Sequence, residues 1–250
     1  MRKLLIAGNW KMNGSLPLAK EMLCSLKQAL SSNDRIESML FPSFVHVAQM
    51  VEMAKDSGIM IGAQNVSEKG KGAFTGEVSL NMLSEAKVKH VLLGHSERRS
   101  VYHESDELIF DKTRKAIEQG FHVVFCVGES LVQREAGKTH EVVETQLKLI
   151  LNDVALLTHI TIAYEPVWAI GTGKTATPKQ AQDVHQYIRS KVASVDSKRA
   201  QVMQLLYGGS MNASNATDLL AQEDIDGGLV GGASLNVNEF LGIIECIRQF

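Results

Sequence analysis

The sequence predicts an α/β protein, a single domain formed by an eight-stranded parallel (β/α)8 barrel over residues 1–250. Short apolar segments alternate with segments of helical periodicity, and no Gly/Ser-rich or proline-rich linker divides the chain. Most of the apolar segments lack polar alternation, which is typical of strands buried on both faces. Together these two observations favour a closed parallel barrel.

The expected strands are spread over the whole chain. They cover residues 4–10, 38–42, 59–65, 90–95, 122–128, 159–165, 204–209 and 227–232. An open doubly wound sheet is the rival architecture, and it would favour a G-x-G-x-x-G turn after the first strand. The first strand leads instead into Asn9 and Lys11, so the barrel is the preferred interpretation.

Helices are expected between the strands because apolar residues recur there at intervals of three to four. Three such faces are Leu18, Met22 and Leu26; Val143, Leu147, Ile150 and Val154; and Val184, Ile188 and Val192. One helix start is explicit, since Thr177 suits the N-cap, Pro178 the first helical position and Gln180 the third.

The composition is typical of a cytoplasmic protein and leaves a small anionic substrate possible. The net charge is −2 and the pI is about 6.5, so we expect neither a nucleic-acid partner nor an anionic membrane surface. Three widely spaced cysteines, Cys24, Cys126 and Cys246, suggest neither a disulfide framework nor a C-x-x-C metal site. No secretory signal or membrane-spanning run is expected, and neither is a metal or another cofactor.

Polar residues stand at the carboxyl ends of three expected strands, where barrel active sites form. The first strand ends in Asn9 and Lys11, the fourth in His95 followed by Glu97, and the sixth in Glu165. A cation, an electrophile and a base are therefore expected on one face of the barrel. Taken singly, each has a structural alternative: a solvated lysine, a capping histidine, a carboxylate with a buried partner. Lys11 could also form a Schiff base, as in aldolases.

Glycine-rich turns follow the last two strands, in YGGSM (207–211) and VGGASL (230–235). Many barrels bind one phosphate with the backbone N–H groups of these loops, although paired glycines also simply make tight turns. The stretch GTGKT (171–175) looks like a nucleotide phosphate loop. The position five residues before Gly173 is Trp168, however, so the first glycine of that motif is missing and no nucleotide site is expected.

Two further patterns are assigned no catalytic chemistry. His140, Glu141 and Glu144 resemble part of a zinc-protease helix but lack its second histidine. Arg98 and Arg99 are expected to form salt bridges on a helix face rather than to bind phosphate.

Together, these stretches closely resemble the triosephosphate isomerase family. The matching motifs are GNWKMNG (8–14), AQN (63–65), GAFTGE (72–77), GHSERR (94–99), CVGE (126–129), AYEPVWAIGTGKTATP (163–178), YGGS (207–210) and LVGGASL (229–235). The resemblance covers the chain from end to end. It implies a TIM barrel and an isomerase that interconverts dihydroxyacetone phosphate and D-glyceraldehyde 3-phosphate through an enediolate, in glycolysis and gluconeogenesis and without a cofactor.

The resemblance also implies roles for the residues at the strand ends. Glu165 is expected to be the general base, and a neutral His95 the electrophile at the developing enediolate oxygens. Lys11 is expected to supply positive charge with Asn9 beside it, and Glu97 to act as an ordering partner. The implied phosphate contacts are the backbone at Gly171, Ser210, Gly231 and Gly232.

Two longer segments are assigned by the same resemblance. Residues 166–176 are expected to form a lid over the substrate, and residues 67–78 a loop that reaches into a partner subunit. The second assignment predicts a homodimer with Thr75 near the partner's Asn9 and Lys11. Two lysines in that loop, Lys69 and Lys71, stand where acidic or neutral residues are expected.

Two classes of function are open at this stage. One is the isomerase, with a Schiff-base aldolase that uses Lys11 as the alternative enzyme. The other is a noncatalytic binding protein on the same barrel, and the presence of Glu165, His95 and Lys11 favours the enzyme.

Overall fold

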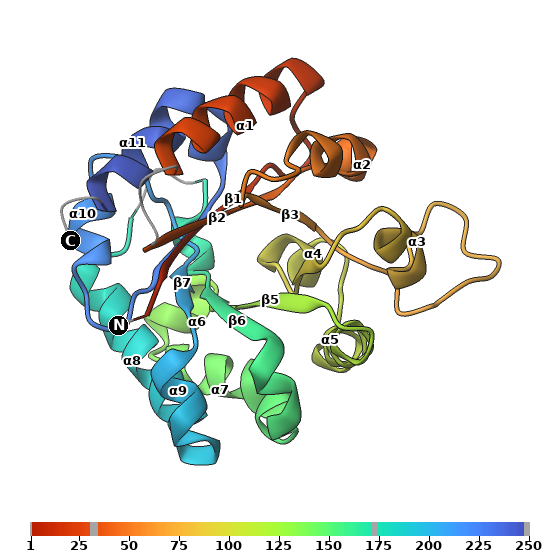
Figure 1. Ribbon diagram of the computed structural model, residues 1–250. Helices are drawn as coiled ribbons and strands as arrows, with labels where there is room; N and C mark the ends of the chain where they lie inside the picture. The colour runs from red at the N-terminus through yellow and green to blue at the C-terminus, as the bar shows by residue number, and fades with distance from the viewer. Residues whose placement is uncertain (1, 31–34, 172–174, 248–250) are drawn as a thin grey trace.

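Eight parallel strands close into a barrel in chain order in the computed structural model, which describes residues 2–30, 35–171 and 175–247 (Figure 1). The strands are β1 (Leu4–Asn9), β2 (Ile36–Phe41), β3 (Met60–Ala63), β4 (His90–Leu93), β5 (His122–Val127), β6 (Ile160–Tyr164), β7 (Leu205–Tyr207) and β8 (Gly227–Val230). Each pairs with the next, and β8 pairs with β1. The predicted (β/α)8 barrel is confirmed.

Helices surround the barrel (Figure 1). They are α1 (Leu16–Leu30), α2 (Phe44–Met53), α3 (Leu80–Glu85), α4 (Ser96–Ser100), α5 (Asp106–Glu118), α6 (Leu131–Glu135), α7 (Thr139–Leu151), α8 (Pro178–Val195), α9 (Ser197–Val202), α10 (Ala216–Leu220) and α11 (Val237–Ile247), with 3-10 turns η1 (Val154–His159), η2 (Val167–Ala169) and η3 (Gly232–Leu235). Within the described residues, no helix is long and apolar enough to cross a bilayer.

The predicted helix faces are buried, with two exceptions. Leu18 at the start of α1 is only partly buried, and Val154 is 38% exposed and lies in η1, beyond the end of α7. The start of α8 is as predicted, because Thr177 and Gln180 form a reciprocal capping box and Pro178 opens the helix.

Two apolar clusters flank the strands. The outer cluster packs the strands against the helices and contains most of the buried apolar residues. The inner cluster fills the barrel with Leu5, Ala7, Met39, Phe41, Leu92, Val124, Cys126, Ala163, Leu206 and Leu229. Side chains alternate along a strand, so every second residue points into the barrel. Inward-facing polar residues beyond the inner cluster mark the two ends of the barrel.

The predicted strands all occur, but their boundaries differ from the structure by one to three residues, mostly because the predicted ranges run too far at the carboxyl end. Two of these differences matter for the fold and the site. Strand β2 begins at Ile36 rather than at residue 38, because the polar Glu37 continues the parallel register with β1. Strand β7 ends at Tyr207, and the two glycines that follow it belong to the loop that shapes the site.

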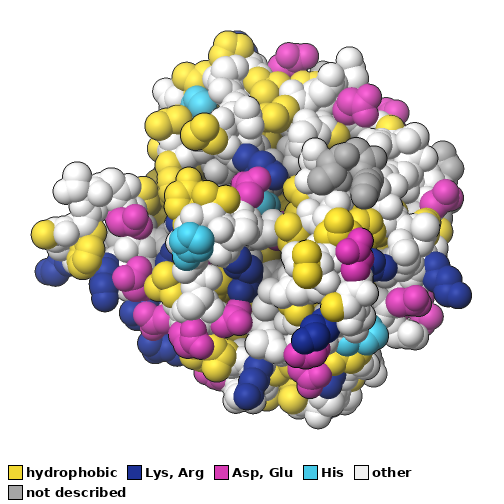
Figure 2. Space-filling model, turned by 180° about the vertical axis from the view of Figure 1, so that it is seen from behind, with side chains coloured by type: hydrophobic (Ala, Val, Ile, Leu, Met, Phe, Trp, Pro, Cys, Tyr) yellow, Lys and Arg dark blue, Asp and Glu magenta, His cyan; other side chains and the backbone are white. Residues whose placement is uncertain are grey.

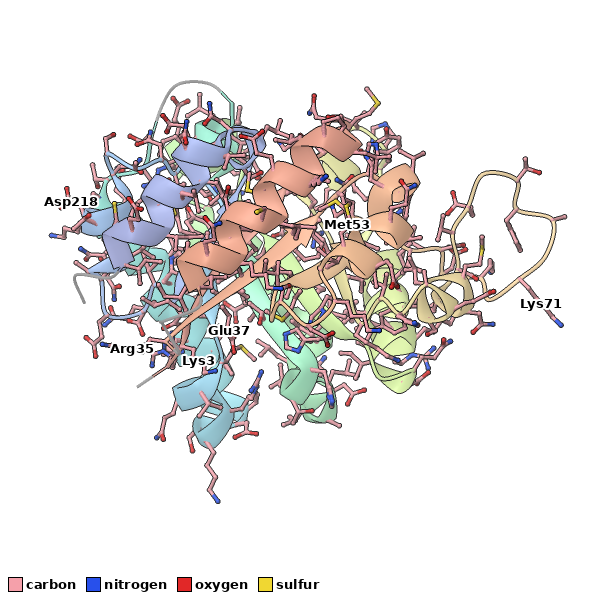
Figure 3. All side chains as sticks on the ribbon, turned by 45° about the horizontal axis from the view of Figure 1, so that its top comes forward. Lys3, Arg35, Glu37, Met53, Lys71 and Asp218 are labelled. Carbon is pink, nitrogen blue, oxygen red and sulfur yellow. The ribbon has the colours of Figure 1, made fainter. Side chains whose placement is uncertain are left out.

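The segment between β3 and α3 extends away from the barrel. It forms the long loop at the right of Figure 1, and Lys71 lies near its outer end in Figure 3. Figure 2 shows the same projection at the left, with hydrophobic and basic side chains at its tip.

Candidate active site

A cavity of about 370 Å³ opens at the carboxyl ends of the strands. It brings together eight of the residues predicted from the sequence: Asn9, Lys11, His95, Glu165, Gly171, Ser210, Gly231 and Gly232. The ninth, Glu97, lines a neighbouring cavity of about 220 Å³ that also contacts Asn9, Lys11 and His95. All the predicted site residues therefore surround one small region.

Glu165 is the most enclosed charged group of the cavity, with 2% of its surface exposed. Its backbone N–H continues the strand ladder by donating to Val127 O at 2.7 Å. The carboxylate accepts a hydrogen bond from Ser96 N at 2.8 Å, and its other oxygen lies 3.0 Å from His95 Nε2. These contacts stabilise a buried carboxylate and fix its position directly after β6.

His95 is the N-cap of α4, and this position fixes its tautomer. Its Nδ1 accepts the Glu97 backbone N–H at 3.2 Å, so in the neutral ring the proton lies on Nε2. That nitrogen is the one that faces Glu165, at 3.0 Å. The imidazole thus presents a hydrogen-bond donor next to the carboxylate.

Lys11 has a left-handed backbone, with φ of 52°, which is uncommon for a lysine. Three side chains hold it there: Asn9 Oδ1 accepts Lys11 N–H at 3.0 Å, while Ser43 Oγ and Gln64 Nε2 donate to Lys11 O at 2.9 and 2.8 Å. The ammonium group pairs with Glu97 at 2.5 Å. Among the described residues that line the larger cavity, Lys11 is the only lysine, and there is no arginine.

The glycine turns bring the backbone close to these side chains. A Cβ on Gly208 would lie 2.8 Å from Glu165 Cγ, and a Cβ on Gly209 would overlap the Tyr207 hydroxyl. Gly231 borders Lys11, since a Cβ there would be 3.7 Å from Lys11 Cε. Packing therefore requires both glycines after β7, Gly208 against Glu165 and Gly209 against Tyr207 and Pro166, in addition to any contact with a phosphate.

Comparison with known proteins assigns the family. A family model described as triosephosphate isomerase matches residues 4–247. The chain belongs to the triosephosphate isomerase family. It is 51% identical to the triosephosphate isomerase of Thiobacillus denitrificans, with the whole of both chains covered. It is 49% identical to that of Pseudoalteromonas translucida, over 99% of this chain and 98% of the relative, and 42% identical to that of Legionella pneumophila, over 99% and 100%.

Membership of this family makes the chain an isomerase of triose phosphate, as its motifs indicated. The cavity has the composition that such a substrate requires. Acidic, basic and hydrogen-bonding side chains meet at one end, and glycine-rich backbone lies close by.

The sequence did not indicate the apolar part of the cavity wall. Leu229, Met211 and Leu235 line it, and each lies beside one of the glycine turns. A buried thiol, Cys126, lies near the carboxylate, and burial together with the charge of Glu165 raises its pKa. All four residues lie in or beside a matching motif, and this position could have indicated them. Apolar residues at such positions look like ordinary core residues, however.

Other predicted features lie outside the cavity. Arg98 pairs with Glu104 at 2.6 Å and Arg99 with Asp106 at 2.5 Å. The salt bridges were predicted correctly, but their partners come from the loop after α4 and the start of α5 rather than from the same helix face. On α7, His140 stacks on Tyr187 with 4.1 Å between ring centroids.

The predicted segment 166–176 is described only in part. Pro166–Gly171 and Thr175–Ala176 are described, with Gly171 at φ of 68°, and residues 172–174 lie outside the described chain. The lid assignment stays a prediction.

Proposed function

We propose that the larger cavity moves a proton between neighbouring carbons of dihydroxyacetone phosphate, with Glu165 as the base. One observation carries this assignment: a buried carboxylate, an imidazole N–H and an ammonium group border the same 370 Å³ cavity. A carboxylate in water is a weak base for a proton next to a carbonyl, so the site must exclude water and stabilise the enediolate.

The proposed reaction has two proton transfers at carbon. Glu165 removes a proton from C1 of dihydroxyacetone phosphate, and the electron pair moves to the C2 carbonyl oxygen to give the enediolate. His95 Nε2–H and the Lys11 ammonium stabilise its negative charge. Glu165 then returns the proton to C2 while a hydroxyl proton passes from O1 to O2, which yields D-glyceraldehyde 3-phosphate.

His95 must change its hydrogen bond during this reaction. In the structure its Nε2 lies 3.0 Å from Glu165. Donation to a substrate oxygen requires that this bond open, which also releases the carboxylate to approach carbon. Ser96 N–H, at 2.8 Å from Glu165, marks the position that the carboxylate leaves.

We assign the phosphate to the glycine-rich side of the cavity. Its backbone partners are Gly171, Ser210, Gly231 and Gly232, from the loops after β6, β7 and β8. Backbone N–H groups bind a dianion without a charged side chain, so the ammonium of Lys11 stays available to the reacting oxygens.

The test is a coupled assay with D-glyceraldehyde 3-phosphate and no added metal or nucleotide. Turnover supports the isomerase, whereas binding without turnover supports a noncatalytic protein. Borohydride with substrate distinguishes the aldolase alternative, because a trapped adduct at Lys11 requires a Schiff base that isomerisation does not.

We further propose that the chain forms a homodimer through residues 67–78. This loop projects from the barrel (Figure 1), and Phe74 within it is 44% exposed. The smaller cavity is bordered by exposed apolar side chains, Met12, Phe44 and Tyr102, of the kind that an interface buries. A loop inserted there would place Thr75 beside the partner subunit's Lys11.

Sedimentation and activity measurements test the dimer together. Phe74→Asp should give monomers with lower activity, because a charge at the loop tip opposes burial. Val132→Asp, at an exposed position of α6, is the matched control and should leave both measurements unchanged. A fully active wild-type monomer at nanomolar concentration contradicts the proposal.

We also infer that residues 1–250 form one domain located in the cytoplasm. The strands that close the barrel extend from Leu4 to Val230, so little of the chain lies outside it. The free thiols of Cys24, Cys126 and Cys246 support a reducing compartment. Fractionation of cells that produce the protein tests its location.

A further inference from the structure

The ends of β5 and β6 are in direct backbone contact at the catalytic carboxylate. The pairing of the two strands ends at Val127 and Tyr164, and Glu165 N–H then donates to Val127 O at 2.7 Å. The residue that follows β5 is Gly128, where a Cβ would overlap the backbone carbonyl of Glu165. Any movement of the Gly128 peptide therefore moves the backbone of Glu165.

A glutamine side chain from outside the barrel holds Gly128. Gln146, half-buried on α7, accepts the Gly128 N–H with Oε1 at 2.7 Å and donates from Nε2 to Gly128 O at 3.1 Å. One amide thus satisfies both backbone groups of a residue that lies beyond the strand pairing. Two bonds to one residue fix its orientation as well as its position.

Glu129, the residue after Gly128, contacts the segment that follows Glu165. Glu129 is fully buried, and its backbone oxygen accepts the Val167 N–H at 3.1 Å. Its carboxylate accepts hydrogen bonds from the Tyr164 hydroxyl at 3.0 Å and from Trp168 Nε1 at 2.9 Å. The pair Gly128–Glu129 consequently contacts the chain on both sides of Glu165.

We propose that Gln146 is a positioning residue for the isomerisation. By fixing the Gly128 peptide, its amide aligns Glu165 with the reacting carbons and fixes the start of the segment that follows the base, through the contacts of Glu129 with Val167 and Trp168. The inference rests on the proposed role of Glu165 as the base. Gln146 acts through Gly128 and does not line the cavity, so we expect it to affect proton transfer more than substrate binding.

Gln146→Met tests this role, because methionine has a similar length and neither donates nor accepts a strong hydrogen bond. We expect kcat to fall about 10- to 100-fold with KM nearly unchanged, since small displacements of a catalytic group are costly. Methylglyoxal and inorganic phosphate per turnover should rise, because a misplaced segment after Glu165 protects the enediolate less well. Gln146→Glu is a second variant that keeps the acceptor for Gly128 N–H but loses the donor to Gly128 O. We expect smaller changes in kcat and in product ratio, in the same direction.

Gln182 offers a matched control on α8. Its amide also makes two hydrogen bonds to one residue, accepting Asp224 N–H at 3.0 Å and donating to Asp224 Oδ2 at 2.7 Å. Asp224 lies just before β8, at the end of the barrel opposite the cavity. Gln182→Met should lower Tm by a similar amount and leave kcat and the product ratio at wild-type values.

The outcomes distinguish a failure of the proposed function from a failure of the role assigned to Gln146. Wild-type protein without isomerase activity contradicts the proposed function itself. The inference is overturned if the wild type is active but both Gln146 variants match Gln182→Met in kcat and product ratio. That result would show that Gln146 only stabilises the fold.

Discussion

Each end of the barrel has a lysine paired with a glutamate, but the two pairs differ in what surrounds them. At the carboxyl end, Lys11 and Glu97 lie 2.5 Å apart between two cavities. At the amino end, Lys3 and Glu37 lie 3.3 Å apart and are visible side by side in Figure 3. Gln204 Nε2 donates to Glu37 and to Lys3 O, so the pair at the amino end belongs to a hydrogen-bonded layer whose side chains stay partly exposed.

Histidines show the same contrast. His95 faces a carboxylate inside a cavity, with its N–H directed at Glu165. At the amino end, His90 and His122 lie with ring centroids 6.0 Å apart, and His122 Nε2 bonds to Thr161 Oγ1 at 2.9 Å. Burial lowers the pKa of both, to about 4 for His122, where the charges of His90, Arg199 and His159 add to the effect.

The difference lies in access and in the identity of the neighbours. Residues at the carboxyl end share a cavity large enough for a small substrate, whereas those at the amino end bond to one another. Under the proposed function, the same residue types therefore serve catalysis at one end and close the barrel at the other. Paired substitutions at the two ends can test this interpretation.

The largest expected difference concerns the two glutamates. Glu165→Gln removes the proton acceptor but keeps the shape, and turnover should fall by about 10²- to 10⁴-fold. Glu37→Gln makes the same change at the amino end and should leave turnover unchanged. Steady-state kinetics on both variants, with folding checked by circular dichroism, decide the point; near-normal turnover of folded Glu165→Gln contradicts its role as the base.

The two lysines should differ almost as strongly. Lys11→Met removes the cation beside the reacting oxygens, and kcat/KM should fall by about 10²- to 10³-fold. Lys3→Met breaks an exposed pair and should cost less than about 1 kcal/mol of stability with no kinetic effect. Equal kinetic losses in the two variants would show that the contrast between the ends is wrong.

The sequence predicted the barrel and most of the cavity because both depend on local patterns. Apolar runs identify strands buried on both faces, and a polar residue at the end of such a run is exceptional, as at Glu165 and His95. Chain order in a parallel barrel then places those residues on one face without knowledge of the side-chain packing.

What the sequence did not predict depends on contacts between distant segments. Gln146 is one of many polar residues on an amphipathic helix, and only the folded chain brings its amide to Gly128. Glu37 and His122 look like polar residues at strand starts, and their shared layer follows from how the closed barrel aligns its strands. The Arg98 and Arg99 partners were misplaced for the same reason.

The half-buried histidines predict an acid-sensitive amino end. The folded-state pKa of His122 is about 4 and its ordinary value is 6.5, so below pH 6.5 the unfolded chain binds more protons. Stability from this group is complete above pH 6.5 and decreases as the pH falls to about 4, by at most about 3 kcal/mol. Urea unfolding between pH 4 and 8 should therefore show a shallower pH dependence for His122→Gln than for wild type. His140→Gln, on the exposed face of α7, is the matched control, and parallel curves for His122→Gln and wild type would contradict the prediction.

The smallest expected effect is the loss of one hydrogen bond in the same layer. Thr161 is 1% exposed and its hydroxyl bonds to His122, so Thr161→Val keeps the volume of the side chain but leaves the imidazole nitrogen without this partner. Unfolding free energy at pH 8 should fall by about 1 kcal/mol, since His122 is half-buried and water can replace part of the lost bond. Turnover should stay at the wild-type value, because no catalytic group depends on this layer. Urea unfolding and kinetics on one preparation measure both quantities. A loss of turnover with unchanged stability would mean that the two ends of the barrel are coupled, and the separation of catalysis from closure argued above would fail.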